Sequence, residues 1–383
     1  MRGRADDQGQ LFFTINVESR IRSDHPLRSV KKTVDRILKS LSPLFDEAYS
    51  SIGRPGVPPE RLLKALLLMS IYSVRSERAL VERIDTDLLF RWFLDMSPED
   101  PVFDATAFTH NRPRMDEFGI TSAFFDAVVT EAINAGLCSD DHFSVDGTLI
   151  ESLASMKSFR PKDEQDEDGN HGDGNSFKPR NPDVDFHGTK RSNKTHSSRT
   201  DPEARLYRKG PGKPSQLAHM GHLLTENRNG LIMEVDVTEA NGRAEREAAI
   251  AMLDRSKVKR NRKPKTLGAD VGYDAGGFFI DLESRDVEPH VAMRKKEPAD
   301  PETIQKRARK RNCEARVRMR ERLKSVGYAI SQRVRKKIEE CFGWQKTIAG
   351  AGRSRWKNRW KIKQNFELTA AAYNLLRIRK LTT

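Results

Sequence analysis

The chain has 383 residues, 36% of them hydrophobic, and its 69 lysines and arginines outnumber 55 aspartates and glutamates, for a formal net charge of +14. This length allows two or three domains with real cores. The positive charge favours a polyanion, nucleic acid first, as the partner. The most apolar uncharged stretch, residues 65–74, is far shorter than the roughly 20 residues that cross a bilayer, so we expect no membrane partner. No apolar signal core follows Met1, and Cys138, Cys313 and Cys341 form no CxxC pair, which predicts a reducing cytoplasm.

The N-terminal third predicts a bundle of helices. Apolar residues recur at helical spacing from residue 30 to about residue 114. The pattern predicts one amphipathic helix over 30–45, a buried helix over 62–74, two short helices that start at Ser76 and Asp87, and another over 104–114. We therefore expect an all-helical domain over residues 1–135.

From His142 onward the pattern changes to the alternation of apolar and polar residues that is typical of strands. An Asn/Gly-rich loop at 227–230 predicts a hairpin. Strands are predicted over 142–149, 217–225, 231–238, 266–271 and 289–293, and helices over 244–257, 277–284, 331–346 and 366–378. This alternating order predicts a mixed α/β domain over residues 138–383, which the last helix closes.

Two segments interrupt that domain. Residues 160–205 are polar, with few apolar side chains, and predict a mobile insertion that cannot bury enough surface to fold alone. Their histidines, at 171, 187 and 196, have irregular spacing and no nearby cysteine, so we assign no zinc. Residues 295–330 predict a basic helix, which either is a solvated face or binds phosphate. We favour phosphate binding, by Arg309, Lys310, Arg311, Arg316 and Arg320.

Three carboxylates are candidate site residues. Asp146 and Asp270 each lie in an apolar strand, where an unpartnered ionised carboxylate is costly. A salt bridge or a strand-end cap would explain one such residue, but two favour a site. On the predicted helix over 331–346, about 100° per residue places Glu339 at the border of the apolar stripe and Glu340 toward solvent. Two strand aspartates and a helical glutamate make an oxygen-only ligand set that suits Mg²⁺ or Mn²⁺.

The segments around these carboxylates form a specific combination. They are Phe143–Thr148, Ala269–Asp274 and the spacing Arg335-x3-Glu339-x6-Lys346, accompanied by residues 219–222, 226–230 and 370–374. This combination resembles the signatures of bacterial insertion-sequence transposases of the DDE type, over nearly the whole chain. The resemblance implies an α/β fold: an RNase H-like mixed sheet with flanking helices, preceded by the all-helical domain.

The resemblance also assigns roles to residues. It implies that Asp146, Asp270 and Glu339 are the metal ligands and that Arg335 and Lys346 contact DNA beside them. Mg²⁺ or Mn²⁺ is the implied cofactor.

One position departs from the family's pattern and one ligand has an alternative. The family's helical signature usually begins with a tyrosine seven residues before the glutamate, where this chain has Gln332. Asp274, beyond Tyr273 at the end of its strand, is the alternative to Asp270.

The predicted function is that of a transposase. It would cut at the terminal inverted repeats of its element and join the 3′ ends to target DNA, with the same metal ions serving both steps. The implied partners are double-stranded DNA, of the element ends and the target, and further copies of this chain, in a bacterial cytoplasm at the nucleoid. The helical domain over 1–135 is a candidate for binding DNA ends. The alternatives are a catalytically inactive, transposase-derived DNA-binding protein, and an RNase H-like nuclease without strand transfer.

A last basic region follows the predicted site helix. Trp344, Trp356 and Trp360 lie among cations that include Arg353 and Arg355, and we expect these cations to bind DNA. Aromatic side chains between cations either stack on unpaired bases or anchor the packing, and the sequence favours neither.

Overall fold

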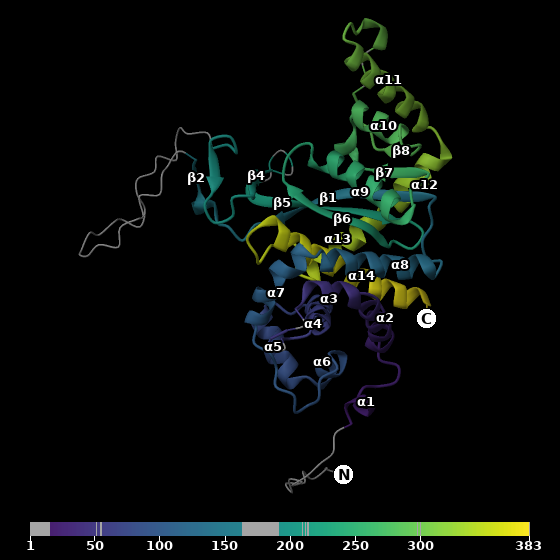
Figure 1. The fold of residues 1–383 in the computed structure, drawn as a ribbon. Coiled ribbons are helices and arrows are strands. Elements are labelled where there is room, and N and C mark those ends of the chain that lie inside the picture. The colour runs from purple at the N-terminus through teal and green to yellow at the C-terminus, as the bar shows by residue number, and fades with distance from the viewer. Residues whose placement is uncertain are drawn as a thin grey trace, which may run out of the picture.

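In the computed structural model of the chain, the described residues are 16–50, 52–53, 56–162, 191–208, 210, 212, 214–296, 298 and 300–382. A bundle of helices lies at one end and a mixed sheet with its own helices at the other (Figure 1). The predicted α/β fold class, a mixed sheet with flanking helices preceded by a helical part, is confirmed.

The N-terminal helices are short and set off by caps and prolines. Asp87 caps one of them, since its carboxylate accepts a hydrogen bond from the backbone N–H of Leu89. The predicted single helix over 30–45 is wrong: it divides at Leu41, because Pro43 cannot continue a helix and instead starts the next one. The helices are α1 (Val17–Arg20), α2 (Leu27–Ser40), α3 (Ser42–Ala48), α4 (Pro59–Ile71), α5 (Glu77–Thr86), α6 (Leu88–Phe93), α7 (Thr106–Glu117) and α8 (Ile120–Asn134).

The main sheet has the strand order β4-β5-β1-β7-β8, with β6 also paired to β5. β1 runs antiparallel to β5 and parallel to β7. The predicted hairpin joins β5 to β6, and its turn is closed by the Glu226 carboxylate, which accepts from three backbone N–H groups of the turn, and by Gly230 at a φ of +71°. The strands are β1 (His142–Glu151), β4 (Arg205–Tyr207), β5 (Gln216–Glu226), β6 (Ile232–Glu239), β7 (Thr266–Ala269) and β8 (Glu288–Val291).

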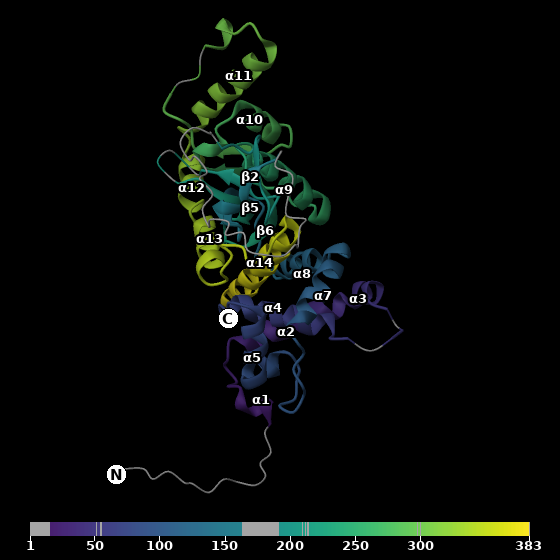
Figure 2. The same ribbon diagram turned by 90° about the vertical axis from the view of Figure 1, so that its left-hand side faces the viewer.

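Helices cover both faces of this sheet. α9 lies on one face and α12 with α13 on the other, while α11 extends beyond the sheet at the end farthest from the N-terminal bundle (Figure 2). The helices are α9 (Ala244–Arg260), α10 (Gly276–Glu283), α11 (Arg307–Arg322), α12 (Val326–Val334), α13 (Lys337–Thr347) and α14 (Arg359–Thr382), and the short 3-10 turns are η1 (Met156–Ser158), η2 (Val271–Tyr273) and η3 (Pro301–Thr303).

The last helix joins the two ends of the molecule. α14 packs against β6 on one side and against α8, α4 and α2 on the other, so it closes the sheet's core and also anchors the N-terminal helices (Figure 1). Its Glu367 carboxylate is buried and accepts hydrogen bonds from the hydroxyls of Thr121 and Ser122, both at 2.6 Å.

The single helix predicted over 331–346 is wrong, because the chain turns between α12 and α13. Ser331 on α12 bonds to His142 on β1, whereas Lys337 at the start of α13 donates to the backbone carbonyls of Asn227 and Arg228 in the β5–β6 turn. The backbone between the two helices forms tighter i→i+3 hydrogen bonds, from the N–H of Ile338 to the carbonyl of Arg335 and from the N–H of Glu339 to the carbonyl of Lys336, which separates α12 from α13.

Most of the predicted polar insertion, residues 163–190, lies outside the described residues. The segments that flank it pair as β2 (Phe159–Pro161) and β3 (His196–Ser198). Beyond β3, the fully buried Asp201 accepts from the Ser152 hydroxyl at 2.7 Å and bonds to His219 Nε2 at 2.9 Å. Residues 191–205 are therefore fixed to the sheet, contrary to the expectation of mobility there.

Candidate active site

The strand register brings Asp146 and Asp270 side by side. β1 pairs with β7 from His142 opposite Thr266 to Ser144 opposite Gly268. The same offset, continued by two residues, sets Asp146 beside Asp270 just past the end of β7. Adjacent strands lie about 4.8 Å apart, so the two carboxylates share one edge of the site.

Both aspartates project toward α12 and α13. His142 on β1 contacts Ser331 on α12, with its Nε2 2.8 Å from the serine hydroxyl oxygen. Alternate residues of a strand share a face, so Asp146, four positions further, projects to the same side. Each carboxylate also accepts a backbone hydrogen bond at 2.8 Å: Asp146 from Gly147 and Asp270 from Gly272.

Asp274 is no longer an alternative to Asp270. Its side chain is fully buried and forms a two-pronged ion pair with the Arg316 guanidinium, both N–O distances being 2.9 Å. It also accepts from the backbone N–H of Arg294 at 3.0 Å. Its oxygens therefore hold the loop and α11 in place, whereas Asp270 is partly exposed.

Glu339 lies on the helix that packs against β1, the strand of Asp146. It is exposed in the first turn of α13, while the neighbouring Ile338 is buried where α13 packs against β1. Among the residues that the structure describes, no three histidines, cysteines, aspartates or glutamates converge closely enough to hold a metal ion. The strand register thus pairs two of the three predicted ligands, and the third lies on a helix that packs against the strand of Asp146.

Sequence reasoning missed one carboxylate at this edge. Glu245, in the first turn of α9, reaches the backbone beside both aspartates: a methyl group at Gly147 would lie 2.7 Å from its Oε1 atom. No pattern in the sequence separates Glu245 from its neighbour Glu247, since both follow the third strand in the same helical turn.

The donor groups at this edge fit a divalent metal ion. They are carboxylate oxygens, which hard cations such as Mg²⁺ and Mn²⁺ prefer. The buried hydroxyl of Tyr273 beside them has no hydrogen-bond partner among the described residues. Burial raises the pKa of Tyr273, and the charges of Glu245, Asp146 and Asp270 raise it further.

The position of the family's usual tyrosine has a defined role in this chain. The Gln332 side-chain amide donates to the backbone carbonyl of His290, at the end of β8, over 2.5 Å. Gln332 therefore positions α12 against the sheet. Beside this contact, burial and the charge of His290 lower the pKa of His142 to about 4.

Several of the predicted DNA-binding cations on α11 are engaged by protein groups. Arg316 pairs with Asp274, Lys310 pairs with Glu302, and Arg320 donates to the backbone carbonyls of residues 294–296. Arg309 and Arg311 instead lie exposed on the same helix. The structure therefore divides the predicted set into anchoring residues and surface cations.

The cations near the site helix also differ in their surroundings. Arg335 lies at the junction of α12 and α13, and Lys346 is exposed in the last turn of α13. Exposed Arg353 lies 3.8 Å from Glu151, while Arg355 donates to the backbone carbonyl of Val74 at 3.1 Å. Arg355 thus ties this loop to the N-terminal helices.

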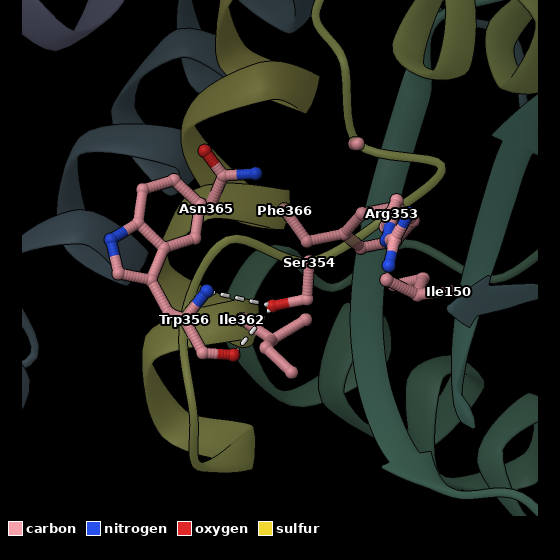
Figure 3. Close-up of a pocket in the computed structure, with 8 residues that line it drawn as sticks. Ile150, Arg353, Ser354, Trp356, Ile362, Asn365 and Phe366 are labelled. Carbon is pink, nitrogen blue, oxygen red and sulfur yellow. Dashed lines mark hydrogen bonds between the residues drawn. The ribbon is translucent and has the colours of Figure 1, made fainter. Parts of the chain in front are cut away.

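Two of the three tryptophans are packing anchors. Trp356 lines a small cavity with Ser354 and Phe366, and the Ser354 hydroxyl donates to the Trp356 carbonyl at 2.7 Å (Figure 3). The guanidinium of Arg112 lies 4.6 Å from the ring centroid of Trp356. The ring of Trp344 packs edge-on against a tyrosine of α14, with 5.8 Å between centroids.

Two family models match the chain. Residues 15–114 match "Transposase domain (DUF772)" and residues 190–375 match "Transposase DDE domain", which together span about three quarters of the chain. No curated protein matches it. None of the described helices is long and apolar enough to cross a membrane.

Some solved structures show weak similarity. A piggyBac transposase synaptic complex with hairpin DNA is 9% identical, with 93% of this chain and 76% of that chain covered and a TM-score of 0.40. A Mos1 transposase paired-end complex with the left transposon end is 12% identical, with 84% and 87% covered and a TM-score of 0.21.

Proposed function

The chain belongs to the insertion-sequence DDE transposase family, and from this premise we propose that it cuts DNA at the terminal inverted repeats of its own element and joins the freed 3′ ends to target DNA. It is a metal-dependent enzyme whose core is RNase H-like. The observation that carries the proposed chemistry is the pair of aspartates, Asp146 and Asp270, which the register of two adjacent parallel strands sets side by side.

Asp146, Asp270 and Glu339 would hold divalent ions, for which Mg²⁺ and Mn²⁺ are our candidates. Such ions, when bound, activate a water or a 3′-hydroxyl and stabilise the leaving oxygen of a phosphodiester. The aspartates are fixed by the strand register and by their bonds to Gly147 and Gly272. Glu339, exposed in the first turn of α13 where that helix packs against β1, would supply the third carboxylate.

The remaining groups would position DNA. Arg335 and Lys346 flank Glu339 on its helix and at its junction, where they would contact the phosphates next to the site. Arg309, Arg311 and Arg353 are exposed cations that would hold the backbone further away. The partner is double-stranded DNA, of the element ends and the target.

We further propose the division of labour along the chain. Residues 1–135 would bind the element ends, and residues 138–383, with the segments 160–205 and 295–330 inserted, would carry out catalysis. Pairing two ends requires more than one copy of the chain in the active complex. The bacterial cytoplasm, at the nucleoid, is where such substrates occur.

A duplex that carries the element's terminal repeat tests this function. With Mg²⁺ or Mn²⁺, the full chain should release a labelled 3′ end and join it to a second duplex. Cleavage without joined products would instead identify a nuclease. Tight binding without any product would identify a DNA-binding protein that has lost catalysis.

A further inference from the structure

We propose that Glu245 is a further carboxylate ligand of the metal site. We also propose that residues 147 and 272 are glycines because a side chain at either position would collide with the Glu245 carboxylate. This inference rests on the proposed function, since it assumes that Asp146 and Asp270 bind a divalent ion. It adds a ligand from the face of the sheet opposite to Glu339.

The start of α9 is fixed firmly next to the loop that follows Asp270. The Asn241 side-chain carbonyl accepts the backbone N–H groups of Arg243 and Ala244, both at 2.8 Å, which sets the first turn of the helix. The guanidinium of Arg246 donates to the backbone carbonyl of Gly272 at 3.0 Å. Glu245, between these anchors, is therefore held against the site by its own helix.

The two glycines form a cradle for the Glu245 carboxylate. A methyl group at Gly147 would lie 2.7 Å from Oε1 of Glu245, closer than real side chains approach. A methyl group at Gly272 would lie 3.4 Å from Oε2 of Glu245 and 3.0 Å from Oδ1 of Asp270. Because both oxygens lie so near one point, the carboxylates of Glu245 and Asp270 are neighbours.

The sheet itself is open at this edge. β7 ends at Ala269, while β1 continues to Glu151, so the part of β1 beyond Asp146 does not pair with β7. A side chain from the α9 face can therefore reach the edge where the two aspartates lie. Gly147, next to Asp146, leaves the space between Glu245 and the two aspartates free of a side chain.

A buried hydroxyl provides an independent indication of a ligand here. Tyr273 is fully buried, its hydroxyl has no hydrogen-bond partner among the described residues, and burial together with the charges of Glu245, Asp146 and Asp270 raises its pKa, which Arg246 lowers. A buried hydroxyl without a partner carries a desolvation cost of about 1–3 kcal/mol. A carboxylate oxygen rotated toward this hydroxyl would accept a hydrogen bond from it.

The side chains need only small movements to converge. Asp146 and Asp270 each accept, through Oδ1, a hydrogen bond from the N–H of a glycine one or two residues further along the chain, which turns these oxygens toward the backbone. Rotation about the side-chain bonds would redirect the carboxylates toward a common ion. This accounts for the lack of a closed three-ligand group among the described residues.

Metal binding without DNA tests the inference directly. Free Mn²⁺ is measured by electron paramagnetic resonance during titration of the full chain and of the variants Glu245→Gln, Glu247→Gln and Asp146→Asn. Glu247 is the matched control, because it lies in the same helical turn but is exposed. We expect Glu245→Gln and Asp146→Asn to weaken Mn²⁺ binding at least about tenfold, and Glu247→Gln to leave it unchanged.

The outcomes separate the inference from the proposed function. If Glu245→Gln binds Mn²⁺ as the native chain does while Asp146→Asn is impaired, Glu245 is not a ligand and the proposed function stands. If the native chain binds no Mn²⁺, or if Asp146→Asn binds it normally, both fail. Gly147→Ala gives a second test, because its methyl group would displace Glu245 and should weaken Mn²⁺ binding with every carboxylate present. Equal thermal melting curves confirm that the variants are folded.

Discussion

Arg316 was predicted from sequence to bind DNA, and the structure leads to a different expectation. Its guanidinium holds both oxygens of the fully buried Asp274, which also accepts the backbone N–H of Arg294. This pair ties α11 to the loop that follows Asp270. We therefore expect Arg316→Ala to destabilise the fold and to leave the electrostatic part of DNA binding nearly unchanged.

The size of the effect follows from burial. Breaking a buried ion pair by removal of one partner costs about 3–5 kcal/mol, because the other charge stays buried. Solvent screens part of this interaction, since the Arg316 side chain is 26% exposed. We therefore expect the free energy of unfolding to fall by about 2–3 kcal/mol, below the value for a fully buried pair.

Two assays on the same variants check this expectation. Urea unfolding gives the free energy of unfolding, and duplex affinity at several salt concentrations gives the number of phosphate contacts. Arg311→Ala is the matched control, because Arg311 is exposed on the same helix. It should lower the salt slope by about one and change stability by less than about 0.5 kcal/mol. Arg316→Ala with native stability and a reduced salt slope would refute the reasoning.

Other measurements test other parts of the structure. The rings of His142 and His222 should stay neutral at pH 6, because burial lowers the pKa of each to about 4. The unfolding free energy should therefore fall as the pH drops from about 6.5 toward 4, where only the unfolded chain takes up the protons. A midpoint near 6.5 in an NMR titration would contradict this. Asp201→Asn should lower the unfolding free energy in urea by about 2–3 kcal/mol, since a buried serine and histidine lose their charged partner; a loss below about 1 kcal/mol would argue against that role. Burial raises the pKa of the Cys138 and Cys341 thiols to about 12, so a thiol reagent should modify them only after urea is added, and rapid labelling of the native chain would be inconsistent with the fold.

Local patterns in the sequence predicted most of the strands and many of the helices. The hairpin around Gly230 and the strands that carry Asp146 and Asp270 were found because alternation and turn residues are local signals. The helix break before Lys337 was missed, because it depends on contacts that Ser331 and Lys337 make with residues 189 and 110 positions away in sequence.

The site was predicted less completely for the same reason. Which of Asp270 and Asp274 faces the site depends on the partner of Asp274, an arginine that lies 42 residues away in sequence. Glu245 gave no signal, since its closeness to Gly147 exists only after the sheet has formed. Residue type and spacing identified candidate metal ligands. Three-dimensional contacts then distinguished these candidates from a carboxylate that pairs with an arginine to hold the fold together.

The central claim is that Asp146, Asp270 and Glu339 form one metal site for both cutting and joining. The most direct test compares Asp146→Asn, Asp270→Asn and Glu339→Gln on a labelled duplex with the element's end, in Mg²⁺ or Mn²⁺. Glu340→Gln is the control, because Glu340 is exposed and adjacent to Glu339. We predict that each of the three variants binds the duplex but neither cuts nor joins it, while Glu340→Gln does both. Full cleavage and joining by Glu339→Gln, or by either aspartate variant, would contradict the claim.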